Sequence, residues 1–171
     1  MTTEIFQRDI LPLKTPIFRY AFFMLKNKED ATDISQEVLI KIWEKRDDWN
    51  SIENMRSWAM TITRNKCLDE LKSRKKEHYS WDDNLDRVEE QTPFIQSSIS
   101  DETAWVRKLM QDLPQDQREV FYLRHFEGNS YKEISDNLRL SESKVKVYLH
   151  RARSFIKRSL EEKHDYGLKT G

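Results

Sequence analysis

The sequence is poor in the residues that build tight turns, covalent crosslinks and metal sites. It contains three glycines, four prolines and one cysteine, Cys67, among 171 residues. A single cysteine excludes an internal disulfide, and without a cysteine or histidine cluster at ligand spacing we expect no metal site. Few turn formers and no stretch of strict apolar and polar alternation disfavour hairpin-rich β folds. The sequence therefore predicts an all-α protein.

Long apolar runs are missing as well. The longest apolar stretch, around Tyr20–Leu25, is far too short to cross a bilayer, so we expect no membrane insertion. No secretion signal opens the sequence, and we expect a soluble protein of the cytoplasm. A hydrophobic content of 37% is low for one large core in 171 residues and fits two small helical domains better.

The signatures of an enzyme are absent. The four histidines are His78, His125, His150 and His164, and none belongs to a nucleophile or metal constellation. The sequence also has no glycine-rich phosphate loop. We therefore expect neither catalysis nor a cofactor.

The net charge is zero, but the charge is unevenly distributed along the chain. Residues 64–76 hold six basic residues against two acidic ones, and residues 142–163 hold seven against three. Between them, residues 77–102 hold eight acidic residues against one basic residue. This stretch has few aliphatic residues and no sustained helical period, so we interpret residues 77–100 as a flexible acidic linker. It separates a first domain, residues 1–76, from a second, residues 101–165.

Residues 129–153 have the pattern of two short helices around a tight turn, the second with a basic face. Ser130 and Glu133 are spaced to form a capping box on the first helix, and Ser141 can cap the second. The inward faces are supplied by Ile134, Leu138, Val145 and Leu149. This pattern is a helix-turn-helix, which indicates DNA binding. A solvated basic helix face is the alternative, but the capped turn and the basic face coincide.

The first domain shows two helical patterns. The first begins at Asn27 or Asp30, and its apolar stripe consists of Ile34, Val38, Leu39, Ile42 and Trp43. The second begins near Asn54, ends in a basic run at residues 72–76, and has an apolar stripe of Trp58, Ile62, Leu68 and Leu71. Its register is irregular near residues 64–66, where a loop between two helices is one interpretation.

The second domain opens with a helix start signal at residues 100–102, and this helix continues to Met110. Leu113-Pro114 interrupts it, because proline suits the first turn of a new helix. That next helix ends at Gly128, just before the helix-turn-helix.

Three blocks of the chain resemble the extracytoplasmic-function (ECF) group of bacterial sigma-70 factors. Residues 30–45 are similar to the family's core-polymerase-binding helix, and residues 55–76 are similar to its −10 segment. Leu113-Pro114, residues 118–121 and the helix-turn-helix are similar to its −35 segment. The blocks occur in the expected order and spacing. The resemblance implies sigma region 2 and sigma region 4 as the two helical domains of an RNA polymerase sigma factor, which directs promoter recognition, −10 melting and transcription initiation.

The resemblance also implies site residues for the promoter. The face expected in the −35 major groove carries Lys144, Lys146, Val147, His150, Arg151 and Arg153. Asn65, with Arg64 and Lys66, lies where the family's specificity loop holds an everted −10 base, and an amide offers that base a donor and an acceptor. Further basic residues expected to contact −10 DNA, chiefly through phosphates, are Lys72, Arg74, Lys75 and Lys76.

Two tryptophans of the first domain have two interpretations. Trp49 and Trp58 can stack on single-stranded bases of the −10 element, or they can belong to the core. A charged helix face is expected to bind core polymerase, although without the resemblance it would count only as solvated surface. Its residues are Asp33, Gln36, Glu37, Lys41 and Glu44.

The chain departs from the family pattern at several positions of the helix-turn-helix. Arg139 stands where glycine is usual, so it either accepts a left-handed backbone or alters the turn. Ser143-Lys144 replaces the usual Gly-Thr, Val147 replaces a small polar residue, and Tyr148 replaces an arginine. These departures bear on the −35 sequence preference.

The partners implied are bacterial core RNA polymerase, promoter DNA and an anti-sigma protein. One alternative is a stand-alone helix-turn-helix regulator of duplex DNA, with the first domain as a dimerisation or sensor module. Another is a pure interaction module. The upstream basic segment with Asn65 favours a sigma factor, because a duplex-binding repressor has no need of a second DNA-facing segment.

Overall fold

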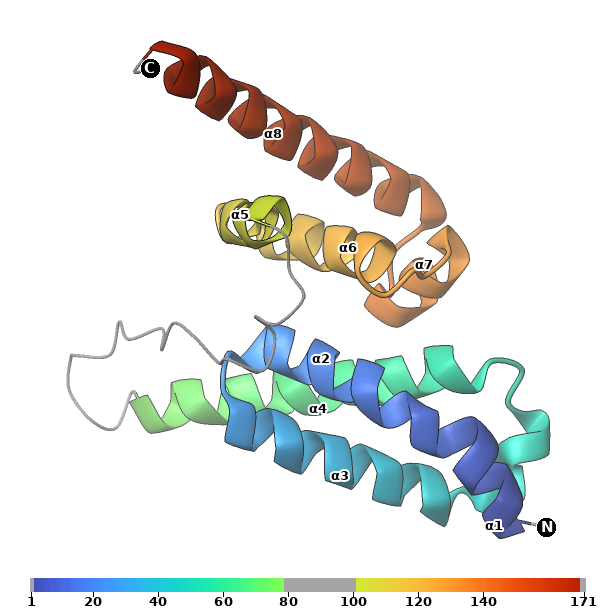
Figure 1. The fold of residues 1–171 in the computed structure, drawn as a ribbon. Coiled ribbons are helices and arrows are strands. Elements are labelled where there is room, and N and C mark those ends of the chain that lie inside the picture. Colours follow the sequence, from blue (N-terminus) through green and yellow to red (C-terminus); the bar gives the residue numbers. More distant parts are fainter. Residues whose placement is uncertain (1, 79–100, 170–171) are drawn as a thin grey trace. The chain divides into compact units, whose positions relative to one another are not determined.

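The computed structural model describes residues 2–78 and 101–169 and divides the chain into two compact units, Met1–Gln91 and Thr92–Gly171. These residues form helices and the turns between them, with no strand in the described part (Figure 1). The predicted all-α class with two small helical domains is confirmed. The predicted linker, residues 77–100, lies outside the described residues except for its first two positions, which end a helix.

The first unit begins with three short helical turns, α1 (Thr2–Ile5), η1 (Phe6–Ile10) and η2 (Leu11–Leu13). They lead into α2 (Lys14–Leu25), a helix that the sequence patterns above did not predict. Its buried face consists of Ile17, Tyr20, Ala21 and Leu25, which recur at helical spacing. The helix therefore exists because this face packs against α3 and α4.

The next helix, α3 (Lys28–Glu44), begins at Asn27. The Asn27 side-chain oxygen accepts a hydrogen bond of 3.0 Å from the Asp30 amide, so Asn27 is the cap of the two predicted alternatives. The predicted stripe is buried at Ile34, Val38 and Ile42. It ends earlier than expected, because the Trp43 side chain is 36% exposed.

The fourth helix, α4 (Met55–His78), follows the turn η3 (Arg46–Ser51) and packs against α2 and α3 (Figure 1). The predicted loop near residues 64–66 is wrong, because α4 is continuous there. Its buried register passes through Ala59, Thr63 and Cys67, whereas Leu68 is only half-buried. The Thr63 hydroxyl donates to the Ala59 carbonyl at 2.8 Å, which satisfies it within the core. The buried stripe of α4 therefore continues through small side chains of low hydrophobicity. For this reason the apolar pattern of the sequence appeared irregular at residues 64–66.

The second unit contains α5 (Asp101–Met110), α6 (Gln115–His125), α7 (Tyr131–Leu138) and α8 (Glu142–Lys169). The long helix α8 packs against the other three. The predicted interruption at Leu113-Pro114 is confirmed, with Pro114 as the cap of α6. Arg118 closes the connection by donating to the carbonyls of Gln111 at 3.0 Å and Leu113 at 2.9 Å. The unit's core includes Met110, Leu113, Val120, Leu123, Ile134, Val145, Leu149 and Ala152.

Candidate nucleic-acid interface

The predicted capping box opens α7. The Ser130 hydroxyl accepts from the Glu133 amide at 3.1 Å, and the Glu133 carboxylate accepts from the Ser130 amide at 2.7 Å. Just before it, Arg124 of α6 donates to the Asn129 carbonyl at 2.8 Å. Two amide donors at the start of α7 are thereby satisfied, and the entry to the helix-turn-helix is tied to α6.

The turn between α7 and α8 has a left-handed residue at Arg139, with φ 55°. Of the two alternatives for this position, the structure shows the first: arginine accepts the conformation in which glycine is usual. The Ser135 carbonyl accepts hydrogen bonds from the amides of Arg139 and Leu140, the latter at 3.1 Å. The Ser135 hydroxyl donates to the Leu140 carbonyl at 2.5 Å. Three hydrogen bonds to one serine therefore hold the turn in place.

The start of α8 is capped by Ser141 as predicted, although the bond is long. The Ser141 hydroxyl accepts from the Lys144 amide at 3.3 Å, and the Ser141 carbonyl accepts from the Val145 amide at 3.0 Å. Val145 and Leu149 are 0% and 1% exposed, and α8 packs against α7. The orientation of α8 is thus fixed by its buried side, which leaves the opposite side to solvent.

All six residues predicted for the −35 contact are exposed on α8: Lys144, Lys146, Val147, His150, Arg151 and Arg153. The six are not equally available. The Arg153 guanidinium donates to His125 Nε2 at 3.1 Å, so this arginine lies at the edge of the face, against α6. Two lysines lie over aromatic rings, Lys144 at 5.6 Å from the centre of Tyr148 and Lys146 at 5.8 Å from the centre of Tyr131.

His125 is a neutral hydrogen-bond acceptor in this arrangement. Partial burial lowers its pKa, and the nearby positive charges of Arg153 and Arg124 lower the pKa further. Its ring also lies 4.3 Å from the ring of Phe121, centre to centre. A neutral imidazole can accept from Arg153, whereas a protonated one has only donors.

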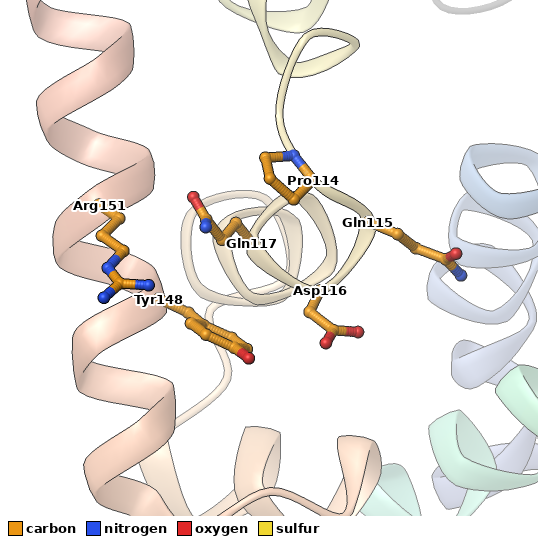
Figure 2. A pocket seen from close by; sticks show the side chains of 6 residues that line it. All are labelled: Pro114, Gln115, Asp116, Gln117, Tyr148 and Arg151. Carbon is orange, nitrogen blue, oxygen red and sulfur yellow. The ribbon is translucent and has the colours of Figure 1, made fainter.

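A hollow of about 390 Å³ lies beside this face, between α8 and the first turn of α6. Figure 2 shows Tyr148 and Arg151 on α8, on the side of the hollow opposite Pro114, Asp116 and Gln117, while Gln115 points away from the other side chains. Every lining residue except Pro114 has a polar or charged side chain, and the hollow is open to solvent. On the α6 side, sequence reasoning named only Pro114, as part of Leu113-Pro114, since no motif marks the three residues after it.

In the first unit, the continuous helix α4 contains all the predicted −10 residues except Trp49, which lies in η3. Asn65 is exposed in mid-helix rather than in a loop, and Lys72 and Lys76 follow it at intervals of seven and four. These intervals place the three side chains on one stripe of the helix, with Lys75 beside it. Arg64 is half-buried.

Two basic residues of α4 are engaged in ion pairs within the unit. The Lys66 ammonium lies 2.5 Å from the Glu37 carboxylate of α3. Arg74 bridges α4 to α3, because its guanidinium donates to Asp30 and also to Glu70 at 3.1 Å. The positive charge of Arg74 is therefore compensated locally, whereas no ion pair among the described side chains engages Lys72, Lys75 or Lys76.

The two tryptophans have partners inside the unit. Trp49 Nε1 donates to the Ile42 carbonyl at 3.0 Å, and its ring lies 6.3 Å from Phe6 and 6.2 Å from Trp43. Trp58 is half-buried and packs against the core. Both side chains thus contribute to packing, and each retains some exposed surface.

The face of α3 predicted to bind polymerase is exposed at Asp33, Gln36, Glu37, Lys41 and Glu44. Sequence reasoning missed Ile40, whose side chain lies on the same face and is 57% exposed. The sequence did contain this information, because an isoleucine three residues after Glu37 must lie on the charged side of the helix. A single exposed aliphatic residue is ordinary on a protein surface, so Ile40 adds an apolar position to this face without by itself identifying a partner.

Metal sites and membrane-spanning helices are both absent from residues 2–78 and 101–169. No group of three histidine, cysteine or carboxylate side chains there could hold a metal ion. In the same residues, no helix combines the length and apolar character needed to cross a bilayer.

Comparison with known proteins agrees with this organisation. Residues 11–77 match the family Sigma-70 region 2, and residues 103–156 match Sigma-70, region 4. The chain is 27% identical over 154 residues to the ECF RNA polymerase sigma factor SigX of Bacillus subtilis, covering 85% of this chain and 78% of SigX. It is 26% identical over 152 residues to the ECF sigma factor EcfG of Rhodopseudomonas palustris, covering 89% and 83%.

A solved structure shares the fold. The sigma factor RpoE of Bartonella quintana, crystallised in complex with the anti-sigma factor NepR, matches with a TM-score of 0.78 and 24% identity. The match covers 91% of this chain and 96% of RpoE. Since both sigma-70 regions are present in order and together span more than half of the sequence, the chain belongs to the sigma-70 family, in the ECF group of RNA polymerase sigma factors.

Proposed function

We propose that this sigma factor contacts a promoter through two separate surfaces and core polymerase through a third. The domains are residues 1–76, a linker at 77–100 and residues 101–165. The observation that carries the proposal is the geometry of the second unit, a capped helix-turn-helix whose second helix buries Val145 and Leu149 and exposes a basic face. Such a helix fits the major groove with its first turns against the base edges.

In the second unit, the −35 element is contacted by the exposed face of α8. Lys144 and Arg151 lie on one side of this face, and Lys146 and His150 lie on the other. Arginine can donate two hydrogen bonds to a guanine edge, which assigns base contact to Arg151. Arg153, held by His125, is placed for a phosphate at the edge of the groove.

In the first unit, the −10 element is contacted by the exposed stripe of α4. The Asn65 amide contacts a base, and Lys72, Lys75 and Lys76 contact phosphates. Arg64 and Lys66 flank Asn65, with Lys66 shared between DNA and Glu37. Arg74, Trp49 and Trp58 support this surface through their contacts within the unit. The two tryptophans, both half-buried, border the melted strand.

Core polymerase binds the exposed face of α3. Its charged residues are Asp33, Gln36, Glu37, Lys41 and Glu44. Ile40 lies among them with 57% exposure and supplies an apolar contact within the charged face. Promoter affinity then arises in the holoenzyme, because two modest DNA contacts act together only when both units are held on one scaffold.

The proposed partners also indicate where the chain acts and whether it catalyses a reaction. As an initiation factor, the chain contributes binding surfaces and no reaction of its own, and it acts in the cytoplasm, where core polymerase and promoter DNA are found. We further propose an anti-sigma protein as its regulator. The solved structure with the same fold supports this, because that sigma factor is bound to the anti-sigma factor NepR.

Run-off transcription tests the proposal. Core RNA polymerase is combined with promoter fragments from the source genome, with and without the purified chain. Initiation at defined sites that depends on the chain supports the proposed function. If the chain stimulates no initiation, the proposal is wrong.

A further inference from the structure

One aliphatic side chain lies at the centre of the exposed face of α8. Because an α-helix turns about 100° per residue, Val147 lies about 200° around the axis from both Val145 and Leu149. Those two residues are 0% and 1% exposed, whereas Val147 is 46% exposed. Val147 therefore points directly away from the core of the second unit.

The side chains around Val147 are polar or charged. Within residues 143–154, the other exposed residues of α8 are Ser143, Lys144, Lys146, His150, Arg151, Arg153 and Ser154. Lys144 and Arg151 are its neighbours at one turn on one side, and His150 is its neighbour on the other. A single exposed valine is ordinary on a protein surface, but this one occupies the middle of the face that enters the groove.

The chemistry of valine restricts what it can contact there. It offers no hydrogen bond, so a cytosine amine or guanine carbonyl facing it would lose water without gaining a partner. The C5-methyl group of thymine is the feature of the major-groove edge that an aliphatic side chain complements. Branching at Cβ also holds valine in one strongly preferred helical rotamer, which fixes its two methyl groups in space.

We propose that Val147 selects thymine at one position of the −35 element by contact with the C5-methyl group. The proposal rests on the proposed function of α8 as the helix that binds the −35 element. Valine at this position, in place of a small polar residue, would then change the −35 sequence preference.

Replacing thymine with uracil tests the proposal, since uracil lacks only that methyl group. The promoter is one that run-off transcription has identified as dependent on this chain. Each thymine of its −35 element, on either strand, is replaced in turn. Affinity of the reconstituted holoenzyme for each duplex is measured by competition. We expect one replacement to weaken binding by about four-fold, the equivalent of one buried methyl group. The same replacement should have a smaller effect on holoenzyme made with Val147→Ala, because alanine lacks the two methyl groups that reach the thymine.

Two further variants sharpen the comparison. Val147→Ile keeps the branched methyl group and should keep the preference for thymine over uracil. Ser154→Ala, on the same face two turns later, is the matched control and should also keep it. The proposal is overturned if no thymine is preferred over uracil, if the −35 element contains no thymine, or if the preference is undiminished in Val147→Ala. If the chain directs initiation but shows no preference for thymine over uracil, only the role of Val147 is wrong. If the chain directs no initiation, the proposed function is wrong as well.

Discussion

The Glu37 carboxylate of α3 lies 2.5 Å from the Lys66 ammonium of α4. This ion pair joins the face proposed to bind polymerase to the helix proposed to bind −10 DNA. Its two side chains are 55% and 28% exposed, so solvent screens the attraction strongly. The pair therefore matters for where the two charges are held, and little for stability.

Glu37→Gln tests the polymerase face at this point. We expect the affinity for core polymerase to fall several-fold while the free energy of unfolding changes by less than about 1 kcal/mol, as for other exposed ion pairs. Equilibrium binding to core polymerase and urea denaturation give the two quantities. Glu161→Gln, which removes an exposed carboxylate from the second unit, is the control and should leave polymerase affinity unchanged. Equal losses in both variants would count against the α3 face.

Arg74 and Lys76 are predicted to behave in opposite ways. Arg74→Ala leaves the carboxylates of Asp30 and Glu70 without their partner and should destabilise the first unit by roughly 1 kcal/mol. Lys76→Ala should leave stability unchanged and lower promoter affinity of the holoenzyme. Because it removes one phosphate contact, the slope of log affinity against log salt should shrink by about one. An unchanged slope for Lys76→Ala would place this lysine away from DNA.

Arg139 provides a test of backbone strain. A non-glycine residue in the left-handed region costs roughly 1 kcal/mol, so Arg139→Gly should stabilise the second unit by about that amount. Arg139→Ala removes the same side chain without freeing the backbone and should be close to neutral. Amide hydrogen exchange of α7 and α8 measures this unit separately from the first. Stabilisation by alanine as large as that by glycine would mean that the side chain, not φ, is the source of the cost.

His125 makes the stability of the second unit depend on pH. Its pKa in the folded chain lies below the ordinary value near 6.5, because burial and then Arg153 and Arg124 disfavour the protonated form. The unfolded chain thus binds the proton more readily, so this contribution is fully present above the unfolded pKa and is lost as the pH falls from that value through the lower folded pKa. Hydrogen exchange of α6 and α8 between pH 7.5 and 5.5 should show this loss. His125→Gln can still accept from Arg153 and should reduce the pH dependence; an unchanged dependence would contradict the assignment.

The sequence predicted the helix-turn-helix best, because its signals are local. Ser130, Glu133 and Ser141 act through the backbone of their own helices, so their spacing alone was informative. The conformation of Arg139 was not decided by sequence, since either a strained residue or a different turn was compatible with it. Hydrogen bonds from and to Ser135 favour the strained residue.

The first unit was harder to predict, because its tertiary contacts outweigh its local patterns. The helix α2 begins without a side-chain cap and has no acidic residue in its first turn, so no local signal marks its start. The buried stripe of α4 continues through the small residues Thr63 and Cys67, which are weakly apolar. Ion pairs between residues distant in sequence could not be predicted either. The ion pair of Arg74 with Asp30 spans 44 positions, and without it Arg74 resembles its basic neighbours.

Binding of one promoter fragment by the chain alone and by the holoenzyme distinguishes a sigma factor from a stand-alone regulator. We expect weak binding by the chain alone and specific binding by the holoenzyme. Asn65→Ala and Arg151→Ala should each weaken the holoenzyme complex by about ten-fold or more, the loss of one good base contact. Tight, specific binding of duplex DNA by the chain alone, unchanged by core polymerase and by Asn65→Ala, would contradict the account and indicate a stand-alone helix-turn-helix regulator.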